Sequence, residues 1–167
     1  HLLLEAFTGF AERFPAWNVE IWGAEDGKAY YKELQLLIRK NKLENRVFLK
    51  GATSHVEEVL RQGDIFAFPS AYEGFGMALG EAMSMGLPSV AYCTCSAANE
   101  LIKNNKNGFL CEEGIVPFQK SIELLMANRI LRKTMGTNAR YLMQKYDPQH
   151  IWNSWNELLN NIISYHR

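Results

Sequence analysis

The chain has 167 residues, of which 47% are hydrophobic and 22% charged, the composition of an ordinary soluble globular domain. Its 18 basic and 18 acidic side chains cancel, and no lysine or arginine run is present, so no electrostatic feature indicates nucleic-acid binding. A chain of this length suits one domain that buries about 70% of its unfolded surface.

The sequence also lacks the usual marks of membrane insertion, secretion and metal binding. No apolar stretch approaches the roughly 20 residues that cross a bilayer. The opening His-Leu-Leu-Leu-Glu-Ala-Phe lacks the basic leader and small-residue cleavage site of a signal peptide. Cys93 and Cys95 could form half of a metal site, but no second ligand pair accompanies them. With Cys111 they are an odd number, so we expect reduced thiols, no metal and a cytoplasmic location.

Short apolar strand-like runs alternate with runs that show helical spacing of apolar residues. Ser54 and Glu57 form a capping-box pattern, and Asp147 followed by Pro148 is typical of a helix start. The predicted helices cover residues 2–14, 28–40, 54–61, 77–85, 97–103, 116–127, 129–145 and 147 onward, and the predicted strands cover 19–22, 47–49, 65–68, 89–92 and 108–111.

This alternation predicts an α/β domain over residues 1–167: a doubly wound, Rossmann-like parallel sheet with helices on both faces and a helical C-terminus. In such sheets ligands bind beyond the carboxyl ends of the strands. The loops expected there are 23–27, 50–53, 70–76 and 93–98. We expect these four loops to line one crevice.

The most informative segment is Glu-Gly-Phe-Gly-Met-Ala-Leu-Gly-Glu, which begins at Glu73 and ends at Glu81. A strand, a glycine turn and a helix in this order leave the first helical N–H groups free to bind a phosphate. Glu81 lies on a helix that is apolar on nearly every side, where a carboxylate needs a partner. The alternatives are that Glu81 only complements the helix dipole, that Glu73 only caps the helix, and that the glycines only permit positive φ.

A series of motifs resembles the C-terminal, donor-binding domain of GT-B glycosyltransferases, and most closely the retaining group 1 family, also called family 4. The segments that carry the resemblance are 48–51, 64–70, 72–83, 86–90 and 107–110. The resemblance implies that a hexose moves with retention from a nucleotide-diphosphate sugar, such as UDP- or GDP-hexose, to an acceptor. It implies no cofactor and no metal.

The family's paired-glutamate signature falls on Glu73 and Glu81. By resemblance, Glu81 would hold the ribose hydroxyls and Glu73, the candidate catalytic residue, would face the donor sugar. The loop at Gly51 would meet the base through its main chain. The turn between the two acids would cradle the distal phosphate with its backbone amides, at Gly74, Phe75, Gly76 and Met77.

The resemblance also implies that this chain is one half of a two-domain enzyme. Family members carry a Gly-Arg motif and a lysine, which grip the phosphates, before a helix that resembles residues 2–14. We therefore expect the N-terminal acceptor domain and the first strand to be absent, and this fragment alone to be inactive. The missing half would bind a glycan or lipid acceptor and could attach the enzyme peripherally to the inner face of the membrane.

Three other functions stay open. A GT-B epimerase or phosphorylase uses the same scaffold, and a non-catalytic module could keep the nucleotide-sugar pocket without transfer. A plain dinucleotide-binding domain would need a glycine fingerprint after its first strand, which this chain lacks. His55 is expected on the surface. Apolar residues on the last helix are expected to form a core stripe, partly exposed towards the partner domain: Ile151, Trp155, Leu158 and Ile162.

Overall fold

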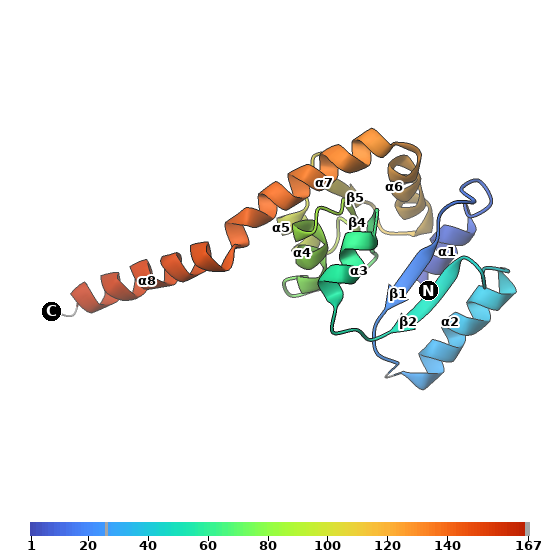
Figure 1. Ribbon diagram of the computed structural model, residues 1–167, viewed down its shortest axis with the longest axis horizontal. Helices are drawn as coiled ribbons and strands as arrows, with labels where there is room; N and C mark the ends of the chain where they lie inside the picture. The colour runs from blue at the N-terminus through green and yellow to red at the C-terminus, as the bar shows by residue number, and fades with distance from the viewer. Residues whose placement is uncertain (26, 166–167) are drawn as a thin grey trace.

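The computed structural model describes residues 1–25 and 27–165, which form alternating strands and helices with a long C-terminal helix that projects from the body (Figure 1). The strands are β1 (Val19–Trp22), β2 (Val47–Gly51), β3 (Phe66–Phe68), β4 (Ser89–Tyr92) and β5 (Gly108–Cys111). The helices are α1 (Leu2–Thr8), α2 (Lys28–Lys40), α3 (Val56–Gln62), α4 (Met77–Ser84), α5 (Ser96–Leu101), α6 (Ile115–Ala127), α7 (Arg129–Met143), the 3-10 helix η1 (Gln144–Tyr146) and α8 (Pro148–Tyr165).

All strand pairs are parallel, as the alternating pattern predicts. The predicted single sheet, however, is divided into a pair, β1–β2, and a triplet in the order β3–β4–β5. In the triplet, Val90 of β4 lies opposite Ala67 of β3 and Phe109 of β5. Within the described residues, no strand pairs with a member of each group, so backbone hydrogen bonds between strands do not join the pair to the triplet.

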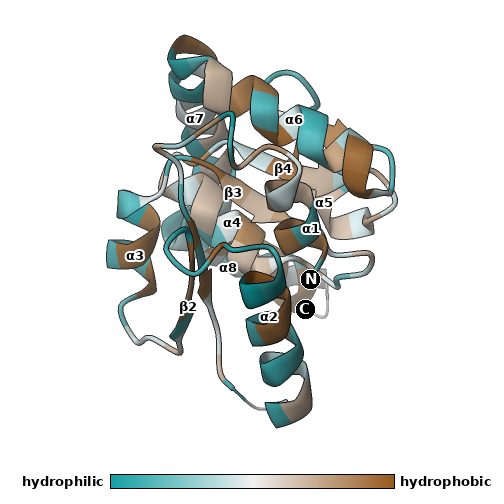
Figure 2. Ribbon diagram, turned by 90° about the vertical axis from the view of Figure 1, so that its right-hand side faces the viewer, coloured by the Kyte–Doolittle hydropathy of each residue, from teal (hydrophilic) through white to brown (hydrophobic). Residues whose placement is uncertain are grey.

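Helices cover both faces of the central strand β4, which confirms the doubly wound α/β architecture. Val90 and Tyr92 belong to one buried cluster, whereas Ala91, between them, belongs to the other. This is the two-residue period of a strand that is buried on both sides. The first cluster receives side chains from α1, α2 and α6, and the second receives them from α4 and α5. Hydrophobic and hydrophilic segments alternate along α2 and α6 (Figure 2), as expected for helices that cover a core with one face.

Two predicted helix boundaries are wrong. The helix predicted to reach residue 14 ends at Thr8, although Phe10 and Ala11 beyond it are buried in the first cluster. The capping box at Ser54 is not formed, because α3 begins at Val56 and its cap residue, His55, makes no side-chain capping bond. Instead the backbone N–H of His55 donates to Thr53 Oγ1 at 3.0 Å. The side chain of His55 is exposed, as expected.

The last helix starts where predicted but does not build a core. Asp147 Oδ1 accepts a hydrogen bond from the N–H of Gln149 at 2.9 Å, which confirms Asp147 as its N-terminal cap. The predicted core stripe is wrong, because α8 leaves the body of the molecule (Figure 1) and its apolar residues stay exposed. The stripe residues are 42–54% exposed: Ile151, Trp155, Leu158 and Ile162. No helix among the described residues has the length and hydropathy that spanning a membrane requires.

The three cysteines are free thiols in different environments. Cys93 is exposed, whereas Cys95 and Cys111 are buried. Burial raises the pKa of the Cys111 thiol to about 11. Across the described residues, no group of three or more histidine, cysteine, aspartate or glutamate side chains is placed to hold a metal ion.

A tight contact between α7 and the turn after α4 gives a prediction for stability. A methyl group at Gly136 would overlap the backbone carbonyl of Gly86, which has no room to move. We expect Gly136→Ala to lower the free energy of unfolding by roughly 1–3 kcal/mol, measured by urea denaturation. Gly80→Ala is the matched control, because its methyl group would meet only the flexible end of Met143 at 3.3 Å. Equal stability of the two variants would contradict this packing.

Thiol labelling tests the cysteine environments. Because the thiolate is the nucleophile and must be reachable, we expect Ellman's reagent to modify Cys93 readily in the folded protein. Cys95 and Cys111 should react only after denaturation. Rapid labelling of all three thiols in the native protein would show that the second cluster or the β4–β5 pair opens easily.

Candidate functional site

The carboxyl ends of β1 and β2 bring two glycines together. The N–H of Gly23 donates to the carbonyl of Gly51 at 2.9 Å. Gly51 has a φ of +74°, a conformation that favours glycine, and a Cβ there would meet no atom within 4 Å. The hydrogen bond from Gly23 holds the main chain at Gly51, and the space beside Gly51 is open. This arrangement suits contact between the main chain and a ligand.

The loop that follows β3 holds Glu73 in a defined orientation. Its carboxylate accepts a hydrogen bond from Ser70 Oγ at 3.2 Å, and its backbone carbonyl accepts one from Ser96 Oγ at 3.4 Å. Ser96 is the first residue of α5, so the loops after β3 and β4 are joined at this point. Glu73 is half-buried and keeps further lone pairs free for a ligand.

Gly76 starts α4 in a left-handed conformation, with φ and ψ of 75° and 51°. A Cβ at this position would also lie only 3.3 Å from the Cβ of Ala97. Glycine is thus required here both by the backbone and by the close approach of α5. No side chain caps α4, so the first N–H groups of the helix lack a side-chain acceptor. Gly74 and Met77, on either side of this point, are exposed.

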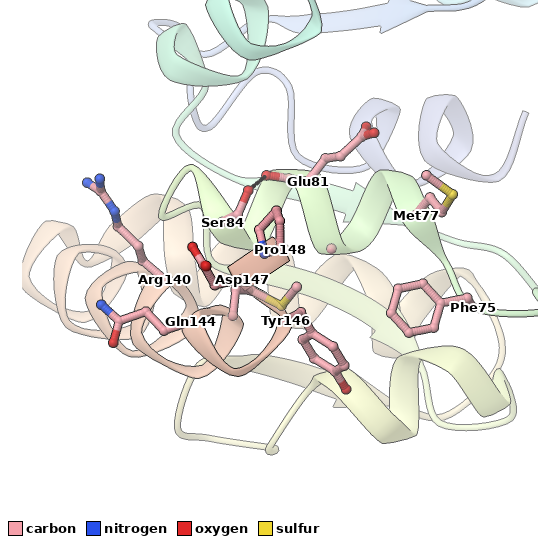
Figure 3. A pocket seen from close by; sticks show the side chains of 11 residues that line it. Phe75, Met77, Glu81, Ser84, Arg140, Gln144, Tyr146, Asp147 and Pro148 are labelled. Carbon is pink, nitrogen blue, oxygen red and sulfur yellow. Dashed lines mark hydrogen bonds between the residues drawn. The ribbon is translucent and has the colours of Figure 1, made fainter. Parts of the chain in front are cut away.

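Glu81 does not need the partner that was expected for a carboxylate on this apolar helix, because it is exposed. Leu79, Ala82 and Met83 are buried, but Glu81 occupies the exposed side of α4. Its carboxylate makes no hydrogen bond or ion pair within the described residues, and it points to the opposite side of α4 from Phe75 (Figure 3). Glu81 is therefore a free acceptor in water rather than a buried acid in need of a partner.

A hollow of about 490 Å³ lies between α4 and the junction of α7 with α8 (Figure 3). From the α4 side it is lined by Phe75, Met77, Gly80, Glu81 and Ser84. From the other side it is lined by Arg140, Met143, Gln144, Tyr146, Asp147 and Pro148. A second hollow, of about 330 Å³ between α2 and β2, contains none of the predicted site residues.

Three residues that touch the predicted site were missed in the sequence. Ser70 and Ser96 fix Glu73, and Tyr146 packs its ring against Phe75, with the ring centroids 5.6 Å apart. Ser70 had a weak signal, because it follows the predicted strand directly. Tyr146 had none, since its contact with Phe75 joins segments that are distant in the chain.

The alanines of the loop after β4 also have a role that the sequence did not reveal. Ala97 and Ala98 are buried in the second cluster, together with Phe68 of β3 and Ala91 of β4. Ala97 also packs directly against Gly76 and so supports the turn.

The chain was compared with known families and proteins. The family model described as glycosyl transferases group 1 matches residues 1–142. A poly(ribitol-phosphate) alpha-N-acetylglucosaminyltransferase of Staphylococcus aureus is 32% identical over 162 residues, which are 96% of this chain and 32% of that enzyme. The match thus runs along nearly the whole chain.

Solved structures agree with the family match. Anabaena HepE in complex with UDP and glucose superposes with a TM-score of 0.84 at 28% identity, over 96% of this chain and 44% of HepE. The same fold is found in the C-terminal domain of a group 1 glycosyl transferase from Francisella tularensis, with a TM-score of 0.78 at 23% identity. The superposition covers 86% of this chain and 76% of the Francisella domain. The chain spans less than half the length of HepE and of the Staphylococcus enzyme. It belongs to the group 1 glycosyl transferase family and has the fold of a GT-B C-terminal domain.

Proposed function

We propose that this chain is the donor-binding half of a retaining glycosyltransferase, which moves a hexose from a nucleotide-diphosphate sugar to an acceptor. The observation that carries the proposal is the uncapped start of α4, which follows a glycine turn and lies between Glu73 and Glu81. Support comes from HepE, which was solved with UDP and glucose.

The turn and the helix start bind the diphosphate. When the bond between the anomeric carbon and the diphosphate breaks, negative charge accumulates on the leaving group. Amides at Gly74, Phe75, Gly76 and Met77 stabilise that charge, because they are already oriented and need no reorganisation. No metal takes part in this binding, so EDTA leaves the affinity for the donor unchanged.

The two acids bind the two ends of the donor. Glu81 accepts hydrogen bonds from the vicinal ribose hydroxyls, which suits an exposed carboxylate without a protein partner. Glu73 faces the sugar and orients it, since Ser70 and Ser96 already fix its position. The open main chain at Gly51 meets the base.

Catalysis needs the other half of the enzyme. The chain spans 44% of HepE and 32% of the Staphylococcus relative, which supports a two-domain protein. The unpaired edges of β1 and β3 fit one further parallel strand from outside the chain. The other domain supplies the glycan or lipid acceptor, so the chain alone binds donor without transferring sugar. The enzyme works in the cytoplasm or at the inner face of the membrane.

Donor binding can be measured on this chain directly. We expect UDP or GDP, or their hexose derivatives, to raise the melting temperature at millimolar concentration. A ligand at 100 times its dissociation constant stabilises the folded state by about 2.7 kcal/mol, which a thermal-shift assay detects. The same titration in EDTA tests whether binding requires a metal. Failure of every nucleoside diphosphate to shift the melting temperature would refute the proposal.

Glu81→Ala tests the ribose contact. Loss of hydrogen bonds to a charged acceptor should weaken nucleoside-diphosphate binding by roughly 10- to 100-fold. The variant should fold normally, because Glu81 is exposed and has no partner in the described structure. Glu157→Ala, an exposed glutamate on α8, is the control and should bind as the wild type does. An unchanged affinity in Glu81→Ala would remove the ribose assignment.

A further inference from the structure

We propose that Tyr146, in the 3-10 helix between α7 and α8, is a positioning residue for the turn that binds the donor phosphates. Tyr146 holds the side chain of Phe75 and thereby fixes the direction of the backbone amides at the start of α4. This inference rests on the proposed function, because it assigns the turn to the phosphates.

The turn needs an external anchor. Phe75 follows Gly74, which gives the backbone before it unusual freedom, whereas Gly76 after it is buried against Ala97. A Cβ at Gly74 would meet no atom within 4 Å, and Phe75 itself is 45% exposed. The phenylalanine ring is therefore the one side chain of the Gly-Phe-Gly segment through which the rest of the protein can hold it.

Tyr146 supplies that anchor. Its ring meets the ring of Phe75 nearly at right angles, with an interplanar angle of 83° and centroids 5.6 Å apart (Figure 3). Edge-to-face contact of this kind is a favoured aromatic geometry that fixes orientation as well as distance. Both side chains line the hollow between α4 and the α7–α8 junction.

Tyr146 is itself held in place from three sides. Its hydroxyl donates to Glu100 Oε1 at 3.5 Å, and the ammonium group of Lys145 lies 4.5 Å from the centre of its ring. The ring also packs against the second buried cluster. A residue fixed in this way can transmit its position to Phe75.

The same helix, α5, supports the turn at both ends. Glu100 of α5 binds Tyr146, and Ser96 of α5 donates to the backbone carbonyl of Glu73 at 3.4 Å. The segment from Glu73 to Phe75 is thus held at its first residue by Ser96 and at its last by Tyr146. Loosening one end should disorder the amides that face the phosphates without altering Gly51 or Glu81.

Binding experiments on Tyr146→Leu test this inference. The variant should bind the preferred nucleoside diphosphate roughly five- to tenfold more weakly, because the aromatic contact is lost. Its affinity for the corresponding nucleoside should stay within about twofold of the wild type, because a nucleoside has no phosphates to contact the turn. NMR titration measures both affinities. Tyr146→Phe keeps the ring and loses only the bond to Glu100, so it should recover most of the diphosphate binding. Tyr141→Leu, which alters a 75% exposed tyrosine on α7, should have no effect.

The backbone amides of Gly74 and Gly76 provide a readout that needs no ligand. In Tyr146→Leu their NMR signals should shift or broaden, whereas in Tyr146→Phe, which keeps the ring and loses only the bond to Glu100, they should change much less. Unchanged glycine signals, or equal diphosphate affinity in wild type and Tyr146→Leu, would overturn the inference. Equal weakening of nucleoside and diphosphate would also overturn it, because it indicates a general loss of structure. If the wild type binds no nucleoside diphosphate but the glycine signals change, the proposed function fails and the structural coupling stands.

Discussion

Burial of β4 on both faces is the constraint on which the rest of this structure depends. All four of its residues are buried, and the side chains of Val90, Ala91 and Tyr92 alternate between the two hydrophobic clusters. One side of the sheet must therefore be covered by α1, α2 and α6 and the other by α4 and α5. Because the strands are parallel, this arrangement brings their carboxyl ends to one edge, where the loops that carry Glu73 and Gly76 meet.

Strands and helices could be predicted from the sequence wherever the spacing of apolar residues fits only one kind of secondary structure. The strands and most helices have the predicted bounds to within a few residues, because short apolar runs and helical stripes are distinct signals. The last helix shows the limit of this reasoning. Its stripe predicts a buried face, but periodicity does not say whether the covering partner belongs to the same chain. Ser54 failed as a cap because α3 begins two residues later, at Val56, and no side chain caps it.

At the candidate site, too, some features could be predicted from the sequence and others could not. The glycine turn and the two glutamates were visible in the sequence because a strand, a turn and a helix were all recognisable around them. The exposure of Glu81 was not, since it depends on which side of α4 faces the second cluster. Tyr146 could not be found at all, because its contact with Phe75 depends on how α7 packs over α4. Local chemistry is thus readable from the chain, whereas support from distant segments is not.

The division of the strands into a pair and a triplet has a consequence for the chain in isolation. The end strands of the pair and of the triplet each have one side that pairs with no strand in the described structure. Such borders attract extended segments of other molecules and are a common origin of aggregation. At high concentration we therefore expect the isolated chain to self-associate through these open strand edges.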